Sequence, residues 1–412
     1  MDSVTNPPVN WKKNLFFIWL CQFLSIAGFS LALPFVPIYI RDKWGIVGEH
    51  ELGLWMSAFY FFGMLSYCGS TPLWGVLADR FGRKLMLLRA SYMAALFYPL
   101  LAFAPNIGVL LLIRFLCSFF SGTVNPAQTL LVTTTPEEKH GFALGTLSTS
   151  IWSGNMTGYL SGGLIVHYFG YTTAFMTCGV VYLISALLVH IFVDEDFRRP
   201  SAAELKTKKA RRSLRDIASP AVLWMLLMFL LMGIARRIEQ PFIAMLVELV
   251  HGEQGAAFFT GVVSAAAALG GVFSGIIIGH FCDRYDPGKL AFPILLISGL
   301  ASILQACSNS IGMLIASRFL AYFAAGGLQP VLQVILAKIV PHDQRGTYFG
   351  WTNSMSQAGG ILCSFISGGI ALLGSVRGIF AAAGLIMFLM VPLMVPARRA
   401  CEQAEKQLNQ AS

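Results

Sequence analysis

Charge is scarce in this chain. Asp, Glu, Lys and Arg make up 12% of the residues, about half of the ~25% found in soluble domains. The eight cysteines stand singly, without a C-x-x-C pair, and the seven histidines show no spacing typical of metal ligands. These absences argue against a soluble domain, and they give no indication of a metal site or a disulfide framework.

Hydrophobic residues, in contrast, fill 56% of the chain, and the mean hydropathy is +0.67. Many of the apolar runs reach the ~20 residues that a helix needs to cross a bilayer. The formal net charge of +9 would suit nucleic acid, but Lys and Arg lie in the loops between the runs, as in membrane proteins. We therefore predict an all-α integral membrane protein that binds no nucleic acid.

The sequence divides into twelve predicted membrane spans. They cover residues 15–40, 52–78, 85–104, 107–134, 141–167, 172–193, 220–247, 255–281, 290–307, 311–337, 346–373 and 377–396. Residues 194–219 form the only long polar segment between spans. The first span is too long for the apolar core of a cleavable signal peptide, so we expect it to remain as a helix.

Basic residues are distributed unequally between the two sides of the predicted spans. With the N-terminus in the cytoplasm, cytoplasmic segments hold 22 of the 29 Lys and Arg residues, and the outer loops hold 3. Such residues concentrate on the cytoplasmic side of membrane proteins. We predict that both termini of this multi-pass protein are cytoplasmic.

The second half of the chain repeats the first. The matching pairs are Gly75–Lys84 with Gly279–Lys289, Arg114 with Arg318, Asn125-Pro126 with Gln329-Pro330, and Pro34-Phe35 with Pro241-Phe242. Six spans per half, entered from the same side, indicate parallel repeats about an axis along the membrane normal, as in transporters with a midplane site. We predict two pseudo-symmetric six-helix bundles (1–193 and 220–396), a basic cytoplasmic linker (194–219) and a cytoplasmic tail (397–412).

The string Gly-Val-Leu-Ala-Asp-Arg-Phe-Gly-Arg-Lys at 75–84 resembles the loop 2–3 motif of the major facilitator superfamily, and Arg114 stands where its helix 4 arginine motif falls. The strings 10–15, 78–89 and 143–149 resemble the drug/proton antiporter branch. The resemblance implies the twelve-helix fold of that superfamily, alternating access and location in the bacterial inner membrane. It also implies a cytoplasmic gate formed by Gly75, Asp79, Arg80, Gly82 and Arg83, with a weaker second copy at Asp283 and Arg284.

Other interpretations of these positions stay open. The charges around Asp79 are either a latch between the bundles or a solvated turn. Arg114 either takes part in proton coupling, as the resemblance implies, or hydrogen-bonds to carbonyl groups of neighbouring helices. Its repetition as Arg318 favours the structural interpretation. Tyr159 departs from the antiporter branch, because it stands where a helix-bending Pro is expected.

The seventh span carries a cluster of charges near its middle, from Arg236 to Gln240. One such charge costs about 2.5–3.5 kcal/mol at mid-depth, so two Arg and a Glu facing lipid would cost roughly 8–10 kcal/mol. The cluster should therefore face a hydrated cavity or partner helices. Helical spacing would allow Arg236 to pair with Glu239. Either this pair is structural, or Glu239 takes the coupling proton while Arg236, Arg237 and Gln240 meet the substrate.

Aromatic side chains offer a second set of candidates for the substrate cavity. Phe35, Trp152 and Tyr159 lie in spans near the presumed cavity. They either line a hydrophobic drug pocket or face lipid.

A transporter is the function class that we predict. A membrane enzyme would need acids, His or Cys gathered at one interface, and the sequence has no such group. The main prediction is proton-coupled efflux of small hydrophobic or amphipathic compounds by a monomer that contacts substrate, protons and membrane lipids and uses no cofactor. The alternative is a carrier for an anionic metabolite, such as a polycarboxylate or a siderophore, which the midmembrane arginines favour.

Overall fold

The computed structural model describes residues 10–46, 48–136, 139–195, 197, 219–340 and 345–411, and these residues form helices and turns without a strand. Within them, eleven segments are long and apolar enough to cross a membrane. One of these, α7 (His140–Phe192), contains both the fifth and the sixth predicted spans and bends at Gly170, where φ is 79°. The structure thus agrees with the predicted all-helical membrane fold.

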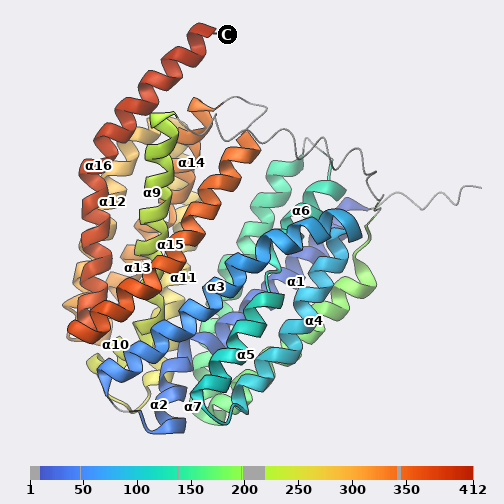
Figure 1. Cartoon of the computed structure of the whole chain (residues 1–412), viewed down its shortest axis with the longest axis vertical. Coiled ribbons are helices and arrows are strands. Elements are labelled where there is room, and N and C mark those ends of the chain that lie inside the picture. The colour runs from blue at the N-terminus through green and yellow to red at the C-terminus, as the bar shows by residue number, and fades with distance from the viewer. Residues whose placement is uncertain are drawn as a thin grey trace, which may run out of the picture. The chain divides into compact units, whose positions relative to one another are not determined.

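Packing divides the chain into two compact units (Figure 1). The first unit comprises Met1–Leu33 and Leu65–Arg211, and the second comprises Pro34–Met64 and Arg212–Ser412. Residues 34–64, from the first half of the sequence, therefore pack with the second half. The boundaries predicted from the sequence stay a prediction, and most of the predicted linker 194–219 lies outside the described residues.

The first unit consists of long helices joined by short turns. Its elements are α1 (Trp11–Ala32), the second part of α3 (Glu49–Phe81), α4 (Arg83–Ala102), α5 (Ile107–Phe120), α6 (Val124–Thr134) and α7. Asparagine side chains cap the N-termini of two of these helices. Asn10 accepts hydrogen bonds from backbone N–H groups at the start of α1, and Asn106 accepts one at the start of α5. Such caps satisfy backbone donors that a helix start leaves without partners.

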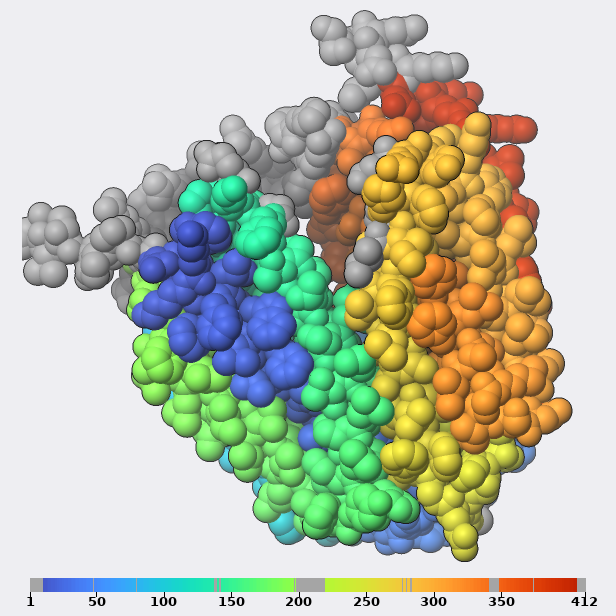
Figure 2. Space-filling view, turned by 180° about the vertical axis from the view of Figure 1, so that it is seen from behind, coloured from blue at the N-terminus to red at the C-terminus, as the bar shows by residue number. Residues whose placement is uncertain are grey.

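In this unit α1 lies between the two arms of α7 (Figure 2). Glycine permits the close approach, since a Cβ at Gly154 would lie 2.8 Å from the carbonyl oxygen of Phe23. A Cβ at Gly158 would clash with the carbonyl oxygen of Ala27. Apolar side chains of α1, α4, α6 and α7 form the hydrophobic core of this unit.

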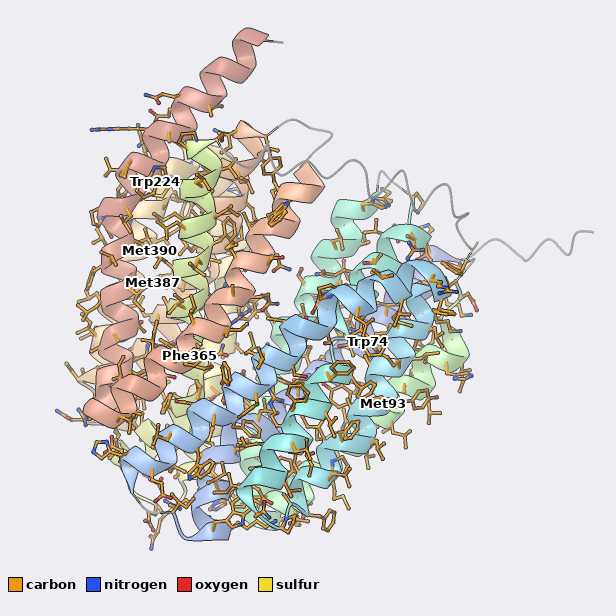
Figure 3. The ribbon with its side chains drawn as sticks, viewed as in Figure 1. Trp74, Met93, Trp224, Phe365, Met387 and Met390 are labelled. Carbon is orange, nitrogen blue, oxygen red and sulfur yellow. The ribbon has the colours of Figure 1, made fainter. Side chains whose placement is uncertain are left out.

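The second unit contains the remaining elements and most of the short helices. They are η1 (Leu33–Phe35, from Pro34 on), α2 (Val36–Trp44), the first part of α3, α9 (Pro220–Arg237), η4 (Gln240–Phe242), α10 (Ile243–His251), α11 (Ala256–Arg284), α12 (Pro287–Ala306), α13 (Ile311–Gly326), α14 (Leu328–Ile339), α15 (Arg345–Leu373) and α16 (Val376–Ala411). Their core includes Met387 and Met390 of α16, which pack near Trp224 of α9 (Figure 3). Each unit therefore has a hydrophobic core of its own.

Four spans are interrupted, and the interruptions fall at the repeated sequence pairs. Each of the 3-10 turns η1 and η4 separates two helices and contains a Pro-Phe pair. The breaks between α5 and α6 and between α13 and α14 precede Asn125-Pro126 and Gln329-Pro330. Proline lacks an N–H group and so favours such breaks. Interrupted helices near mid-depth are where secondary transporters place their binding sites.

The last helix, α16, runs past its neighbours α9 and α12 (Figure 1) and continues to Ala411, beyond the predicted end of the twelfth span. Arg398 on this extension forms ion pairs with Asp286 (3.0 Å) and Glu402 (2.7 Å). Asp286 also caps α12 by accepting a hydrogen bond from the N–H of Gly288. The Asp-Pro that interrupts the second copy of the loop motif thus begins a helix.

Candidate functional site

The interruption of the seventh span places a carboxylate in the interior of the second unit. α9 ends at Arg237, and Glu239 follows in the turn before η4. Pro241 in η4 cannot donate a backbone hydrogen bond, so the helix does not continue through this point. The side chain of Glu239 is buried.

Arg318 of α13 is the ion-pair partner of Glu239. Its Nη1 lies 2.6 Å from Oε1 of Glu239, and both side chains are 4% exposed. Charges this deeply buried are tolerated when they are paired and hydrogen-bonded. The pair therefore brings together two charges that would each be unfavourable alone.

Two further side chains hold the guanidinium of Arg318. Nη1 donates to Oε1 of Gln305 at 3.0 Å, and Nη2 donates to the hydroxyl of Tyr322 at 3.3 Å. The guanidinium carbon also lies 4.7 Å from the centre of the Tyr322 ring. The sequence did not indicate Gln305 or Tyr322, and it pointed to Arg318 only as the repeat of Arg114, a repetition that favoured a structural interpretation.

A cavity of about 10 Å³ adjoins this pair and is lined by Glu239, Tyr322, Ser298 and Ser302, among others. That volume corresponds to about one water molecule. Among the described residues, Oε2 of Glu239 and Oγ of Ser298 are buried and have no hydrogen-bond partner. The second carboxylate oxygen is thus placed where it can accept a proton.

The expected pairing of Arg236 with Glu239 is not observed. Arg236 instead donates to Oε1 of Gln329 at 3.3 Å, and Arg237 donates to the carbonyl oxygen of Ser356 at 3.1 Å. The helical-spacing argument fails because α9 ends before residue 239. Both arginines lie in the last turn of α9, where a positive charge is favourable against the helix dipole.

The other predicted cavity residues are dispersed over the two units. Gln240 is exposed in η4, and Phe35 is fully buried in η1. Trp152 and Tyr159 are half-buried in α7. Their contact with substrate stays a prediction.

Arg114, the counterpart of Arg318, is buried in α5 of the first unit. It interacts electrostatically with Tyr98 and Cys117. Tyr98 stacks on Tyr182 of α7 with ring centres 5.4 Å apart. The role of Arg114 in proton coupling stays a prediction.

The loop motif of the first unit forms a tight turn closed by an acidic side chain. Gly82, with φ of 99°, separates α3 from α4. The two carboxylate oxygens of Glu195 accept hydrogen bonds from the backbone N–H groups of Arg83 and Lys84, each at 2.8 Å. Glu195 thereby caps α4, a contact that the sequence did not indicate.

The remaining gate residues are described only in part. Gly75 and Arg80 are exposed in α3, and Arg284 is exposed at the end of α11. The side chains of Asp79 and Asp283 lie outside the described part of the structure. The gate hypothesis stays a prediction.

The last turn of α2 and the beginning of α3 form a second set of contacts, within the second unit. Arg41 forms an ion pair with Glu248 of α10. Oε1 of Glu49 accepts a hydrogen bond from the N–H of Val376 at 2.6 Å. Further along α3, the hydroxyl oxygens of Ser57 and Ser367 lie 3.3 Å apart. These contacts join segments that the sequence assigns to different bundles.

A chain of apolar spans, with interruptions at repeated positions and an ion pair buried at one of them, is a multi-pass membrane transporter. It belongs to the Major Facilitator Superfamily, whose model matches residues 18–304 and 241–411. Among the relatives are the multidrug resistance protein MdtG of Salmonella arizonae and that of Salmonella paratyphi B. Each is 31% identical over 389 residues, which cover 94% of this chain and 96% of the relative. The resemblance inferred from the loop motif is confirmed.

Solved structures share the fold. A mutant form of the nucleoside transporter NupG aligns with a TM-score of 0.72 at 14% identity, covering 93% of this chain and 99% of NupG. A bacterial homolog of the human lysosomal transporter Spinster aligns with a TM-score of 0.70 at 17% identity, covering 96% and 97%. At such low identity these similarities concern the fold alone.

Proposed function

We propose that the protein exports small hydrophobic or amphipathic compounds by alternating access, driven by protons that enter as substrate leaves. The buried Glu239–Arg318 pair is the observation that carries this proposal. Glu239 is the carboxylate at the interruption of a span, it lines the small cavity, and its buried Oε2 has no hydrogen-bond partner among the described residues. Buried ionisable groups within spans are the usual elements of proton relays.

Protonation would change this network in a defined way. A neutral Glu239 no longer balances the charge of Arg318, whose guanidinium keeps its hydrogen bonds to Gln305 and Tyr322. The break between α9 and η4 adjoins Glu239, so a change at the carboxylate acts at a point where the helix has no continuous hydrogen bonding. This arrangement supports the coupling of protonation to helix movement.

The proposed substrate class is based on the names of the similar proteins. The proteins that align over 94% of the chain are named multidrug resistance proteins, which supports export of several unrelated compounds. We also propose that the protein acts as a monomer with both termini in the cytoplasm. A C-terminal fluorescent-protein fusion should fluoresce in cells, whereas a C-terminal alkaline phosphatase fusion should be inactive.

Reconstituted vesicles test the coupling. Under an imposed pH gradient, Glu239→Gln should lower substrate accumulation at least tenfold and abolish substrate-induced proton flux. Substrate exchange without a gradient should persist, because it needs no net proton transfer. Glu51→Gln, which alters an exposed carboxylate of α3, serves as the control. Unchanged coupled transport by the Glu239 variant would refute the proposal.

A carrier for an organic anion is the second candidate. The arginines within the predicted spans include Arg114, Arg236, Arg237 and Arg318, and the carboxylate described among these four, Glu239, is paired with Arg318. A surplus of positive charge suits an anionic substrate. In a strain that lacks the gene, sensitivity to several unrelated drugs supports export of drugs. A growth defect limited to one nutrient or to iron supports the anion carrier.

A further inference from the structure

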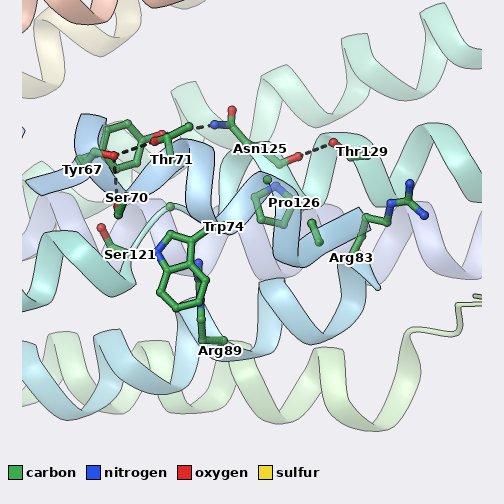
Figure 4. A pocket seen from close by; sticks show the side chains of 13 residues that line it. Tyr67, Ser70, Thr71, Trp74, Arg83, Arg89, Ser121, Asn125, Pro126 and Thr129 are labelled. Atoms are coloured by element: carbon green, nitrogen blue, oxygen red, sulfur yellow. Dashed lines mark hydrogen bonds between the residues drawn. The ribbon is translucent and has the colours of Figure 1, made fainter. Parts of the chain in front are cut away.

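A cavity of about 220 Å³ lies within the first unit and shares no lining residue with the Glu239 network (Figure 4). Its walls come from the second part of α3, the start of α4 and the break between α5 and α6. The lining residues include Tyr67, Trp74, Arg83, Arg89, Asn125 and Thr129. The cavity thus adjoins the loop motif, but none of the predicted substrate residues lines it.

Arg89 of α4 is held in this wall by an aromatic ring. Its guanidinium carbon lies 3.5 Å from the centre of the Trp74 ring (Figure 4). The indole N–H of Trp74 donates to the carbonyl oxygen of Phe119 at 2.7 Å, which fixes the ring. The indole ring that contacts the guanidinium group of Arg89 is therefore itself held in place by a hydrogen bond.

Two nitrogen atoms of Arg89, Nε and Nη1, are buried, and neither has a hydrogen-bond partner among the described residues. Buried donors in proteins are almost always satisfied, and burying one without an acceptor is unfavourable. These N–H groups are donors of a planar fork that matches the geometry of carboxylate and phosphate.

Two hydroxyl groups of the lining already donate hydrogen bonds to backbone carbonyl groups. The hydroxyl of Thr71 donates to the carbonyl oxygen of Tyr67 at 2.7 Å, and that of Thr129 donates to the carbonyl oxygen of Asn125 at 3.0 Å. No Asp or Glu appears among the described lining residues, which leave out the side chain of Asp79. Glu195, the nearby acid, is bonded to the start of α4. Arg89 therefore brings a positive charge and two buried N–H groups without a described partner to the wall of this cavity.

We propose that this cavity binds the oxyanion, carboxylate or phosphate, of an amphipathic molecule, with Arg89 as the residue that recognises it. The rings of Tyr67 and Pro126 offer apolar walls to the carbon atoms next to the oxyanion. The volume is below the 300–1,000 Å³ typical of pockets that enclose drug-sized ligands, so the cavity takes the head of the molecule and not its chain. The site does not depend on proton coupling at Glu239.

Titration with dodecyl phosphate tests the site. The probe is added to the purified full-length protein in neutral detergent, and binding is measured by calorimetry. The wild type should bind it, Arg89→Gln should bind at least tenfold more weakly, and Arg89→Lys should fall between them. Arg399→Gln should match the wild type, since Arg399 is exposed on α16 and does not line the cavity. Dodecyltrimethylammonium, which has the same chain and the opposite charge, should not compete.

A second variant tests whether a loss of binding comes from the cavity itself or from an effect on folding. Ala78→Phe fills the cavity and leaves Arg89 in place, so it should weaken dodecyl phosphate binding as strongly as Arg89→Gln. Equal affinity in wild type and Arg89→Gln, or no preference for the phosphate over the ammonium probe, would overturn the proposal.

Two further measurements distinguish a membrane lipid from a transported acid as the source of the oxyanion. If Arg89→Gln loses co-purified anionic phospholipid, measured by mass spectrometry, the oxyanion is that of a membrane lipid. If the lipid is retained and vesicle transport of decanoate is lost, the oxyanion belongs to a transported acid. If neither lipid content nor decanoate transport changes, the proposal fails.

Discussion

Glu239 and Arg318 form an ion pair of 2.6 Å inside the second unit, although one follows α9 and the other belongs to α13. The neighbouring Arg236, one helical turn from Glu239 in the sequence, binds Gln329 instead. The arginine that balances the carboxylate is thus the one repeated in both halves of the chain. This relationship leads to the first prediction.

Replacing Arg318 by Met should destabilise the protein by about 3–5 kcal/mol, because the buried charge of Glu239 would lose its partner. Thermal unfolding of the purified protein in detergent measures the effect. The double variant Arg318→Met/Glu239→Gln should recover most of the stability, since neither charge of the pair is then left buried without its partner, but should not recover proton-driven transport. Equal stability of the single and the double variant would contradict the pairing.

Gly233 should not tolerate even a methyl group. A Cβ there would clash with the carbonyl oxygen and Cα of Ser356 in α15, and backbone atoms cannot move aside as a flexible side chain can. We expect Gly233→Ala to lower stability by about 1–3 kcal/mol through overpacking.

Gly275 is the matched control, because a Cβ at this helical position meets nothing within 4 Å. Gly275→Ala should be neutral or stabilise by up to about 1 kcal/mol, as expected from helix propensity. Melting temperatures of the two variants in the same detergent decide the comparison. A similar loss in both would show that packing against α15 is not the cause.

Glu195→Ala should weaken the turn of the loop motif by about 1 kcal/mol, because two backbone N–H groups at the start of α4 lose their acceptor. Hydrogen exchange should become faster in peptides covering residues 82–90. Asp194→Ala changes the adjacent acid, whose ion pair with Lys13 at 3.1 Å is exposed, and should alter stability by no more than about 0.5 kcal/mol. Unchanged exchange in the Glu195 variant would count against the cap.

A disulfide between α3 and α15 should stop transport. The hydroxyl oxygens of Ser57 and Ser367 lie 3.3 Å apart, so cysteines at both positions should form a disulfide under mild oxidation. In a background without native cysteines, oxidation should reduce transport at least tenfold, and reduction should restore it. Each single cysteine variant should be insensitive to oxidation. Full transport by the crosslinked protein would exclude separation of these helices during the cycle.

Local signals in the sequence predicted much of the architecture. The pairs Pro34-Phe35 and Pro241-Phe242 coincide with two of the helix breaks, where proline lacks the N–H group that would continue the helix. Proline alone does not decide a break, since Pro72 and Pro99 lie inside the continuous helices α3 and α4. The loop motif at Gly75–Lys84 predicted the family. The single long segment α7 differs from the predicted pair of spans only in that helix continues through the bend at Gly170.

The sequence by itself determined the membrane helices and their repeat, since apolar run length and repeated motifs can be read along the chain, whereas the breaks inside four of the predicted spans came from the structure. Only the tertiary structure decided which arginine neutralises Glu239, that Glu195 caps α4, and that Arg89 rests on Trp74. Each of these contacts joins residues from separate helices, and their distance depends on helix packing and on where α9 ends. The chemistry of the candidate sites therefore arises from packing, whereas the spans that carry them follow from hydrophobicity.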